Sequence, residues 1–276
     1  MRSPWARRAL SCSGGALVVA YCLAPFYWMT ISAFRRPQDQ FDNSIVPTRG
    51  SWENFSAVFS GGEGFGRALL NSLVVAGATT ALTLLIGTCA AYALARLRFR
   101  GKNAVLGLIV AATMFPGISQ LVPLLKLFTE IGWINTYQAM VLPSLGFALP
   151  LSVWLLTAFF RQLPEELEQA AMVDGCTRAQ AFRKIIVPLA APGVFTTAIV
   201  TFIATWNEFL IALSMVNDRD MRTATVAIST FTGASGFDQP FGTQMAAGAV
   251  VTVPLVAVVL VFQRRIVAGL TAGGVK

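Results

Sequence analysis

The 276-residue chain has no histidine, and only 12% of its residues are charged, about half the share found in soluble domains. Without histidine, Ser-His-Asp catalysis, Cys-His catalysis and most zinc sites are excluded. A phosphate-binding loop of the G-x-x-x-x-G-K-[ST] kind is also missing, so the chain does not itself hydrolyse ATP by that route. None of the four cysteines, Cys12, Cys22, Cys89 and Cys176, has a partner at metal-binding or redox spacing. We therefore expect no metal site and no enzyme activity in this chain.

Long apolar runs are abundant instead, since 55% of the residues are hydrophobic. A membrane-spanning helix needs about 20 mostly apolar residues. Six runs qualify, and they cover about 9–33, 67–95, 103–126, 136–160, 188–216 and 242–263. All six are too long to be strands of a membrane barrel. The sequence therefore predicts an all-α polytopic membrane protein, with residues 1–276 as one domain of six transmembrane helices.

The first run follows a basic front formed by Arg2, Arg7 and Arg8, as in a signal peptide. The run is too long for a signal peptide, and no clear small-x-small cleavage site follows it. Cys12, in ALSC, faintly suggests a lipoprotein site, but here the apolar run follows the cysteine instead of preceding it. We expect an uncleaved first helix.

Basic residues indicate the orientation, because they accumulate in short loops on the cytoplasmic side. With the N-terminus inside, the inner segments hold 14 of the 21 Lys and Arg residues. The formal net charge of +8 is then a signal of topology, and no soluble basic face remains to bind nucleic acid. Both termini are predicted to be cytoplasmic, in a multi-pass protein of the cell membrane.

The inner segment 161–187 lies between two apolar runs and contains eight charged residues. Pro164 suits a first helical position, and the three glutamates after it suit a helix N-terminus. Asp174-Gly175 is a turn signal, and Thr177 with Gln180 predicts a capping box that opens a second short helix. Small apolar residues mark one face of the first helix (Leu167, Ala170 and Ala171), and larger ones mark the second (Phe182, Ile185 and Ile186). A solvated loop would not need these faces, which suit docking into a groove of another protein.

This segment resembles the EAA motif of ABC-importer permeases, which reads E-A-A, three residues, Gly, nine residues, I-x-L-P. The matching positions are Gln169, Ala170, Ala171, Gly175, Ile185, Val187 and Pro188. Two residue types depart from the pattern, because Gln169 replaces the family glutamate and Val187 replaces the leucine. The uncharged Gln169 cannot form an ion pair at that position.

The resemblance extends to the maltose-type sugar branch of these permeases, and within it to the second permease of actinobacterial trehalose-type importers. It is carried by SWENFSAVF (51–59), FPGISQLVPL (115–124), QAFRKIIVPLAAPG (180–193), WNEFL (206–210) and FQRRIVAGLTAGGVK (262–276). It implies the ABC-importer permease fold and a cytoplasmic EAA coupling helix that docks on an ATPase. The implied ATPase-coupling residues are Glu168, Gln169, Ala170, Ala171, Asp174, Gly175, Phe182, Ile185 and Pro188.

The resemblance also implies the partners. They are a second homologous permease in a heterodimer, two ATPase subunits that bind ATP and Mg, and an extracytoplasmic sugar-binding protein. This chain would contact membrane lipid and the sugar substrate, and would itself hold no cofactor. Trehalose or another α-linked disaccharide is the expected substrate, while glycerol-3-phosphate esters and amino sugars stay open.

One predicted span carries a polar stripe. Glu208 is the only acidic residue inside the six runs, and a charge at the membrane centre costs about 2.5–3.5 kcal/mol on insertion scales. Thr197, Thr201 and Thr205 precede it on the same expected helix face, and Trp206 and Asn207 adjoin it. These residues are candidates for the substrate path. The alternative is structural, since membrane threonines often bond their own helix backbone.

The outer loop at about 217–241 is long for a connection between adjacent helices. Its apolar and glycine residues, Phe231, Gly233, Phe237, Pro240 and Phe241, are unlike those of a disordered linker. The resemblance implies that this loop contacts the docked binding protein.

Two other classes of protein fit the sequence less well. A secondary transporter usually has several ionisable or unwound sites inside the membrane, whereas this chain has one carboxylate there and no detectable internal repeat. An intramembrane enzyme would need a nucleophile with its base, or a metal cluster.

Overall fold

The computed structural model describes residues 4–40, 42, 44–46, 49–60, 64–231 and 240–272. Regular structure in these ranges is helical, apart from one isolated bridge between Arg35 and Gly50. The chain divides into two compact units. One comprises Met1–Gly66 and Ala227–Pro254, and the other comprises Arg67–Val226 and Leu255–Lys276.

Four helical stretches are long and apolar enough to cross a membrane. They are Cys12–Phe34 of α1 (Pro4–Phe34), α3 (Phe65–Arg96), α6 (Tyr137–Gln162), and Phe241–Phe262 of α13 (Phe241–Ala272). A fifth span results if Arg178–Leu189 and α10 (Ala191–Trp206), which meet at 73°, are taken together. The described residues thus support four or five spans, and the predicted number of six is not confirmed.

Two predicted spans are broken. The run 103–126 forms α4 (Lys102–Ala112) and α5 (Ile118–Glu130), because Pro116 disfavours helical geometry at Phe115. The run 188–216 contains α10, which ends at Trp206, and the separate α11 (Leu210–Met215). Glu208 therefore lies outside the helix that holds the three threonines, and the prediction of one shared helix face is wrong for Glu208.

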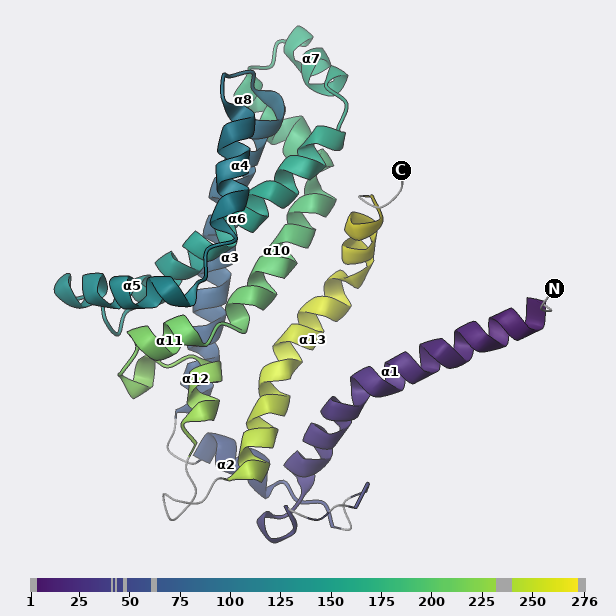
Figure 1. The fold of residues 1–276 in the computed structure, drawn as a ribbon, viewed down its shortest axis with the longest axis vertical. Helices are drawn as coiled ribbons and strands as arrows, with labels where there is room; N and C mark the ends of the chain where they lie inside the picture. Colours follow the sequence, from purple (N-terminus) through teal and green to yellow (C-terminus); the bar gives the residue numbers. More distant parts are fainter. Residues whose placement is uncertain are drawn as a thin grey trace. The chain divides into compact units, whose positions relative to one another are not determined.

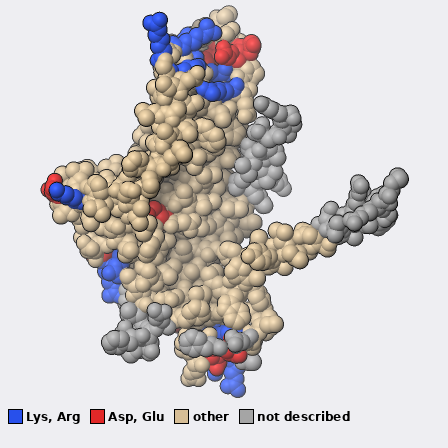
Figure 2. Space-filling model, in the orientation of Figure 1, with Lys and Arg blue, Asp and Glu red and all other residues tan. Residues whose placement is uncertain are grey.

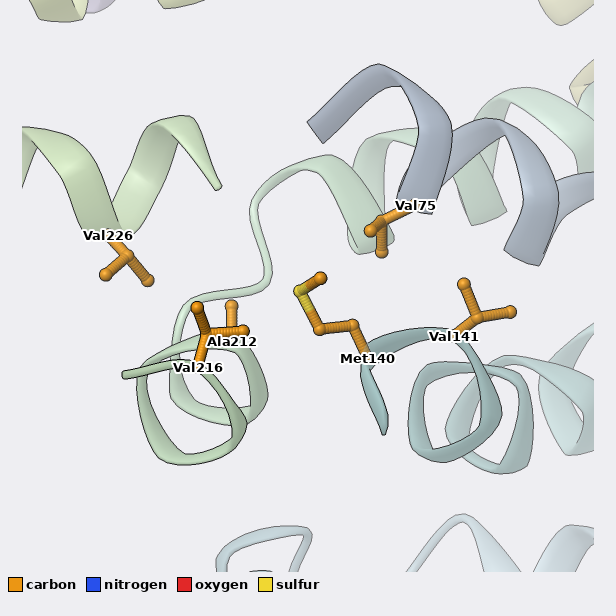
Figure 3. Packing of buried hydrophobic residues seen from close by; sticks show 6 residues of the cluster. All are labelled: Val75, Met140, Val141, Ala212, Val216 and Val226. Atoms are coloured by element: carbon orange, nitrogen blue, oxygen red, sulfur yellow. The ribbon is translucent and has the colours of Figure 1, made fainter. Parts of the chain in front are cut away.

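In the larger unit, α3, α6 and α10 lie side by side along much of their length (Figure 1). Val75, Gly87 and Ala91, spaced by multiples of four, mark the face of α3 that meets α6. Gly87 lies against Ser152 and Leu156, as expected where small residues let membrane helices approach closely. One apolar cluster joins α3, α6, α11 and α12 (Ala224–Ser229), as Figure 3 shows. It contains Val75, Met140, Val141, Ala212, Val216 and Val226.

In the smaller unit, buried polar side chains fold the chain back after α1. Arg35, only 2% exposed, donates to the carbonyls of Asp42 and Ser44 and lies over the Trp28 ring. Asn54 donates to the carbonyls of Ala33 and Arg35. The segment 51–59 is thus held against the end of α1, where it forms most of α2 (Glu53–Ser60).

Candidate functional site

The inner segment forms the two short helices that its sequence predicts. The first, α7 (Glu166–Val173), ends in a Schellman motif, in which the Cys176 amide donates to the Ala171 carbonyl and the Gly175 amide to the Met172 carbonyl. Gly175 has φ +87°, a left-handed conformation that glycine adopts without a steric cost. The glycine therefore sets the direction in which the chain leaves α7.

The second half begins with the predicted capping box, formed by Thr177 and Gln180. Behind it follow α8 (Arg178–Ala181), a π-helical turn η2 (Phe182–Ile186) and α9 (Val187–Leu189). Pro188 lies in α9, next to the 73° bend into α10. The segment is therefore continuous in the chain with the fifth predicted span, across this bend.

The base of the segment is packed on the ends of α3 and α6. Ile186 is fully buried in a cluster with Tyr92, Leu156 and Phe160. The Phe182 ring lies 4.5 Å from the Tyr92 ring, centroid to centroid. This apolar base fixes the segment to the membrane helices of its own chain.

The opposite side of α7 is open. Leu167 and Val173 are 39% and 87% exposed, and Ala170 is exposed between them. Ala171 is buried instead, so the predicted apolar face is divided between an outer and an inner side. Of the other predicted coupling residues, Gln169, Asp174, Gly175 and Pro188 are exposed, Phe182 and Ile185 are half-buried, and Glu168 is buried.

A polar cavity of about 390 Å³ lies beside α7. It is lined by Arg96, Arg98, Glu165, Glu168, Gln169, Met172 and Arg178. Charged residues of both signs gather at this end of the larger unit, whereas the rest of the face in view carries only scattered charges, among them a group at the tip of α5 (Figure 2). Such a distribution is typical of a helix bundle whose sides face lipid and whose end faces water.

A second cavity, of about 140 Å³, lies between α6 and α10. Three predicted path residues, Thr201, Thr205 and Glu208, line it. The α6 side contributes Ser144 and Ser152, and the Ser152 hydroxyl is 3.1 Å from that of Thr201. Apolar residues complete the lining, namely Phe147, Ala148, Leu151, Val200 and Ala204. The cavity therefore combines apolar walls with a few hydroxyl groups and one carboxylate, as is typical of small-molecule sites.

The other predicted path residues lie elsewhere. Thr197 is fully buried and donates to the Gly193 carbonyl, Trp206 is 2% exposed, and the Asn207 side chain donates to the Ile203 carbonyl. Glu208 has a structural role as well, since its two carboxylate oxygens accept the amides of Ile211 (2.8 Å) and Ala212 (3.1 Å) at the start of α11.

The structure describes most of the predicted outer loop. It contains η3 (Arg219–Met221) and α12 (Ala224–Ser229), and Asn71 of α3 donates to the carbonyls of Asp220 and Arg222. Phe231 is 7% exposed and packs on Phe65, while Pro240 and Phe241 are half-buried. Gly233 and Phe237 lie outside the described residues.

Comparison with known proteins assigns the chain to a family. Residues 83–271 match the family of binding-protein-dependent transport system inner membrane components. The chain belongs to this family. The permease is 45% identical to a trehalose transport system permease of Mycobacterium tuberculosis, over 94% of both chains. It is 40% identical to a trehalose/maltose transport system permease of Thermococcus litoralis, over 100% of this chain and 99% of that one.

The fold agrees with this assignment. A chain of a bacterial ABC transporter that imports the acidic polysaccharide alginate superposes with a TM-score of 0.78, at 17% identity, over 96% of this chain and 98% of the other. The protein is therefore a multi-pass inner-membrane protein with the fold of an ABC-importer permease.

Several residues of these sites were not predicted from the permease sequence. Tyr92 and Phe160 form the base under the inner segment 161–187, and Ser144 and Ser152 form part of one wall of the cavity. For Tyr92, the available signal was its spacing of four residues from Arg96 at the inner end of a span. The serines carry no such signal, because serine is common in membrane helices.

Proposed function

We propose that this permease is a membrane subunit of an ATP-driven, binding-protein-dependent importer of trehalose or a related α-linked disaccharide. The names of its two relatives support the substrate class, and the family description supports dependence on a binding protein. The cavity between α6 and α10, in which hydroxyl groups and one carboxylate stand among apolar walls, supports a small polar molecule such as a sugar as the transported molecule.

The proposed assembly contains a second homologous permease, two ATPase subunits and an extracytoplasmic sugar-binding protein. ATP and Mg are bound by the ATPase subunits, and this chain contributes no catalytic residue. Its topology is one permease domain of six spans with both termini in the cytoplasm, in which α4 and α5 together make the third span.

The main observation behind this proposal is that the coupling segment 161–187 is packed on its own chain on one side and exposed on the other. Its inner side is packed on α3 and α6, and the outer side of α7 presents Leu167, Ala170 and Val173 to solvent. Apolar side chains at a water-exposed end of a membrane protein favour a protein partner. An ATPase that closes on ATP would displace α7, and the packed base would pass this displacement to the spans, so that the sugar site opens to alternate sides.

Purification of the complex with its ATPase and binding protein tests the function. We expect the binding protein loaded with trehalose to stimulate ATP hydrolysis and to support uptake into proteoliposomes. If the binding protein stimulates ATP hydrolysis when it is loaded with a glycerol-3-phosphate ester or an amino sugar, and not with trehalose, the proposed substrate is wrong. The absence of stimulation by any loaded binding protein would contradict the importer itself.

Replacement of Glu208 separates its two roles. We expect Glu208→Ala to lower uptake by more than about tenfold without loss of assembly, because the cavity loses its carboxylate and α11 loses two accepted N–H bonds. Glu208→Gln keeps one acceptor oxygen for α11 and removes the charge. Low uptake in both variants indicates a role in the sugar path, whereas native uptake in Glu208→Gln restricts the residue to capping α11.

A shorter outer loop tests the proposed contact with the binding protein. We expect deletion of 232–238 to leave unstimulated ATP hydrolysis intact, because the deletion is remote from the coupling segment in the chain. Stimulation by the loaded binding protein and sugar uptake should both fall sharply. These rates are compared in proteoliposomes, with docking of the binding protein measured separately, and full uptake would show that the loop is only a linker.

A further inference from the structure

Two hydrogen bonds between parts of the chain that are distant in sequence join α3 to the end of α6 and to the start of α7. Tyr92 Oη donates to Glu168 Oε1 over 2.5 Å. Arg96 Nη2 donates to the carbonyl of Leu163, which ends α6, over 2.6 Å. Tyr92 and Arg96 are four residues apart and therefore lie on the same face of α3.

The side chains of Tyr92 and Glu168 are largely buried, and Glu168 also borders the polar cavity beside α7. The two residues are 9% and 8% exposed, and the rings of Phe160 and Phe182 lie within 6.4 Å and 4.5 Å of the Tyr92 ring. A hydrogen bond to a carboxylate is stronger in such surroundings than in water, and its loss leaves a buried charge without its partner.

Three arginines share the cavity with Glu168. Among the described residues, none of the three comes within 4.0 Å of its carboxylate oxygens. The tyrosine hydroxyl is therefore the side-chain group that fixes Glu168, and the arginines contribute a diffuse positive field.

In the chain, α7 is not directly connected to α3. Residues before α7 lead into α6, and residues after Gly175 lead through α8 and α9 into α10. A displacement of α7 can reach α3 only through contacts between side chains or with the backbone. The Tyr92–Glu168 bond is the buried polar contact that joins these two helices directly.

We propose that Tyr92 and Glu168 are positioning residues that make α3 move together with α7 in the transport cycle. This inference rests on the proposed role of the coupling segment. A displacement of α7 would then reach three helices. It would reach α6 and α10 through the chain, and α3 through the Tyr92–Glu168 bond. The buried side of α7 thus acts within the permease, while its exposed side remains available for the ATPase.

Tyr92→Phe tests the proposal, since it removes the hydroxyl and keeps the ring. We expect assembly and unstimulated ATP hydrolysis to stay native, and the number of sugar molecules imported per ATP to fall about tenfold, as for the loss of one buried hydrogen bond. Tyr137→Phe is the matched control. The Tyr137 hydroxyl also bonds α6 to α3, through Asn71 (2.7 Å), but at the other end of α3, so its loss should leave the import ratio native.

The partner residue provides a second test. Glu168→Ala should lower the import ratio more than Glu168→Gln, because the glutamine oxygen still accepts the tyrosine hydroxyl. Tyr92→Phe should add little to Glu168→Ala if both act through one bond. A native ratio in Tyr92→Phe, or an equal loss in Tyr137→Phe, would overturn the inference. If Gly175→Val uncouples transport while Tyr92→Phe does not, this inference fails and the coupling segment stands; if neither uncouples, the coupling role itself fails.

Discussion

Replacement of Gly175 by valine is expected to abolish sugar uptake while leaving the complex assembled and its unstimulated ATPase active. Gly175 has φ +87°, and a Cβ built there meets nothing within 4 Å. The cost is therefore one of backbone conformation and not of space. A left-handed L-residue costs about 1–2 kcal/mol, and a β-branched residue is least suited to it. The strain is relieved if the Schellman turn opens, and α7 then loses its fixed direction relative to α8.

Gly175→Asn is the matched control, because asparagine adopts the left-handed conformation more readily than other non-glycine residues. Uptake of labelled sugar and ATP hydrolysis are measured in proteoliposomes for both variants. We expect Gly175→Asn to retain much of the uptake that Gly175→Val loses. Normal uptake in the valine variant would show that the turn does not take part in coupling.

Replacement of Gly193 by alanine should have the largest effect on stability. A Cβ at this position would lie 2.4 Å from Cγ of Phe159, an atom near the base of that side chain, so the whole ring must shift. Gly193 lies in the first turn of α10, which packs on α6. Overpacking of this kind costs about 1–3 kcal/mol. We expect a lower denaturation temperature in detergent and a smaller yield of the assembled complex.

Gly146→Ala is the comparison for this substitution. Gly146 also lies in a span, α6, but a Cβ built there meets nothing within 4 Å, and its denaturation temperature should match the native one. Gly193→Ala combined with Phe159→Leu should recover part of the loss, because the smaller side chain makes room for the new methyl group. If Gly193→Ala is as stable as Gly146→Ala, the close approach of α10 to Phe159 is not maintained in the protein.

The coupling segment could be predicted closely because its signals are local. The turn at Gly175 and the capping box of Thr177 and Gln180 depend on residues within one or two helical turns. The sequence pattern did not predict burial correctly where contacts with residues distant in the sequence determine it. Ala171 was assigned to the outer apolar face of α7, yet it is buried. A periodicity of three and four does not show on which side α8 and η2 pack against this helix.

The spans show the same limit. Hydropathy located α3, α6 and most of α13 within a few residues, since length and apolar composition are sufficient for that. It could not show that 103–126 is divided into α4 and α5, because prolines also occur inside unbroken membrane helices such as α6, which contains Pro143 and Pro150. Glu208 was placed on the face of the three threonines for the same reason, although the helix ends at Trp206.

A photoreactive residue at Ala170 tests most directly the central claim that the exposed side of α7 is where the ATPase docks. Ala170 lies between Leu167 and Val173 on that side, and the same probe at Leu85, 66% exposed along the span α3, serves as the control. Irradiation of the assembled complex should join the Ala170 probe to the ATPase subunit and leave the Leu85 probe unattached to it. An assembled, transporting complex in which the Ala170 probe does not reach the ATPase, or in which both probes reach it equally, would contradict the account.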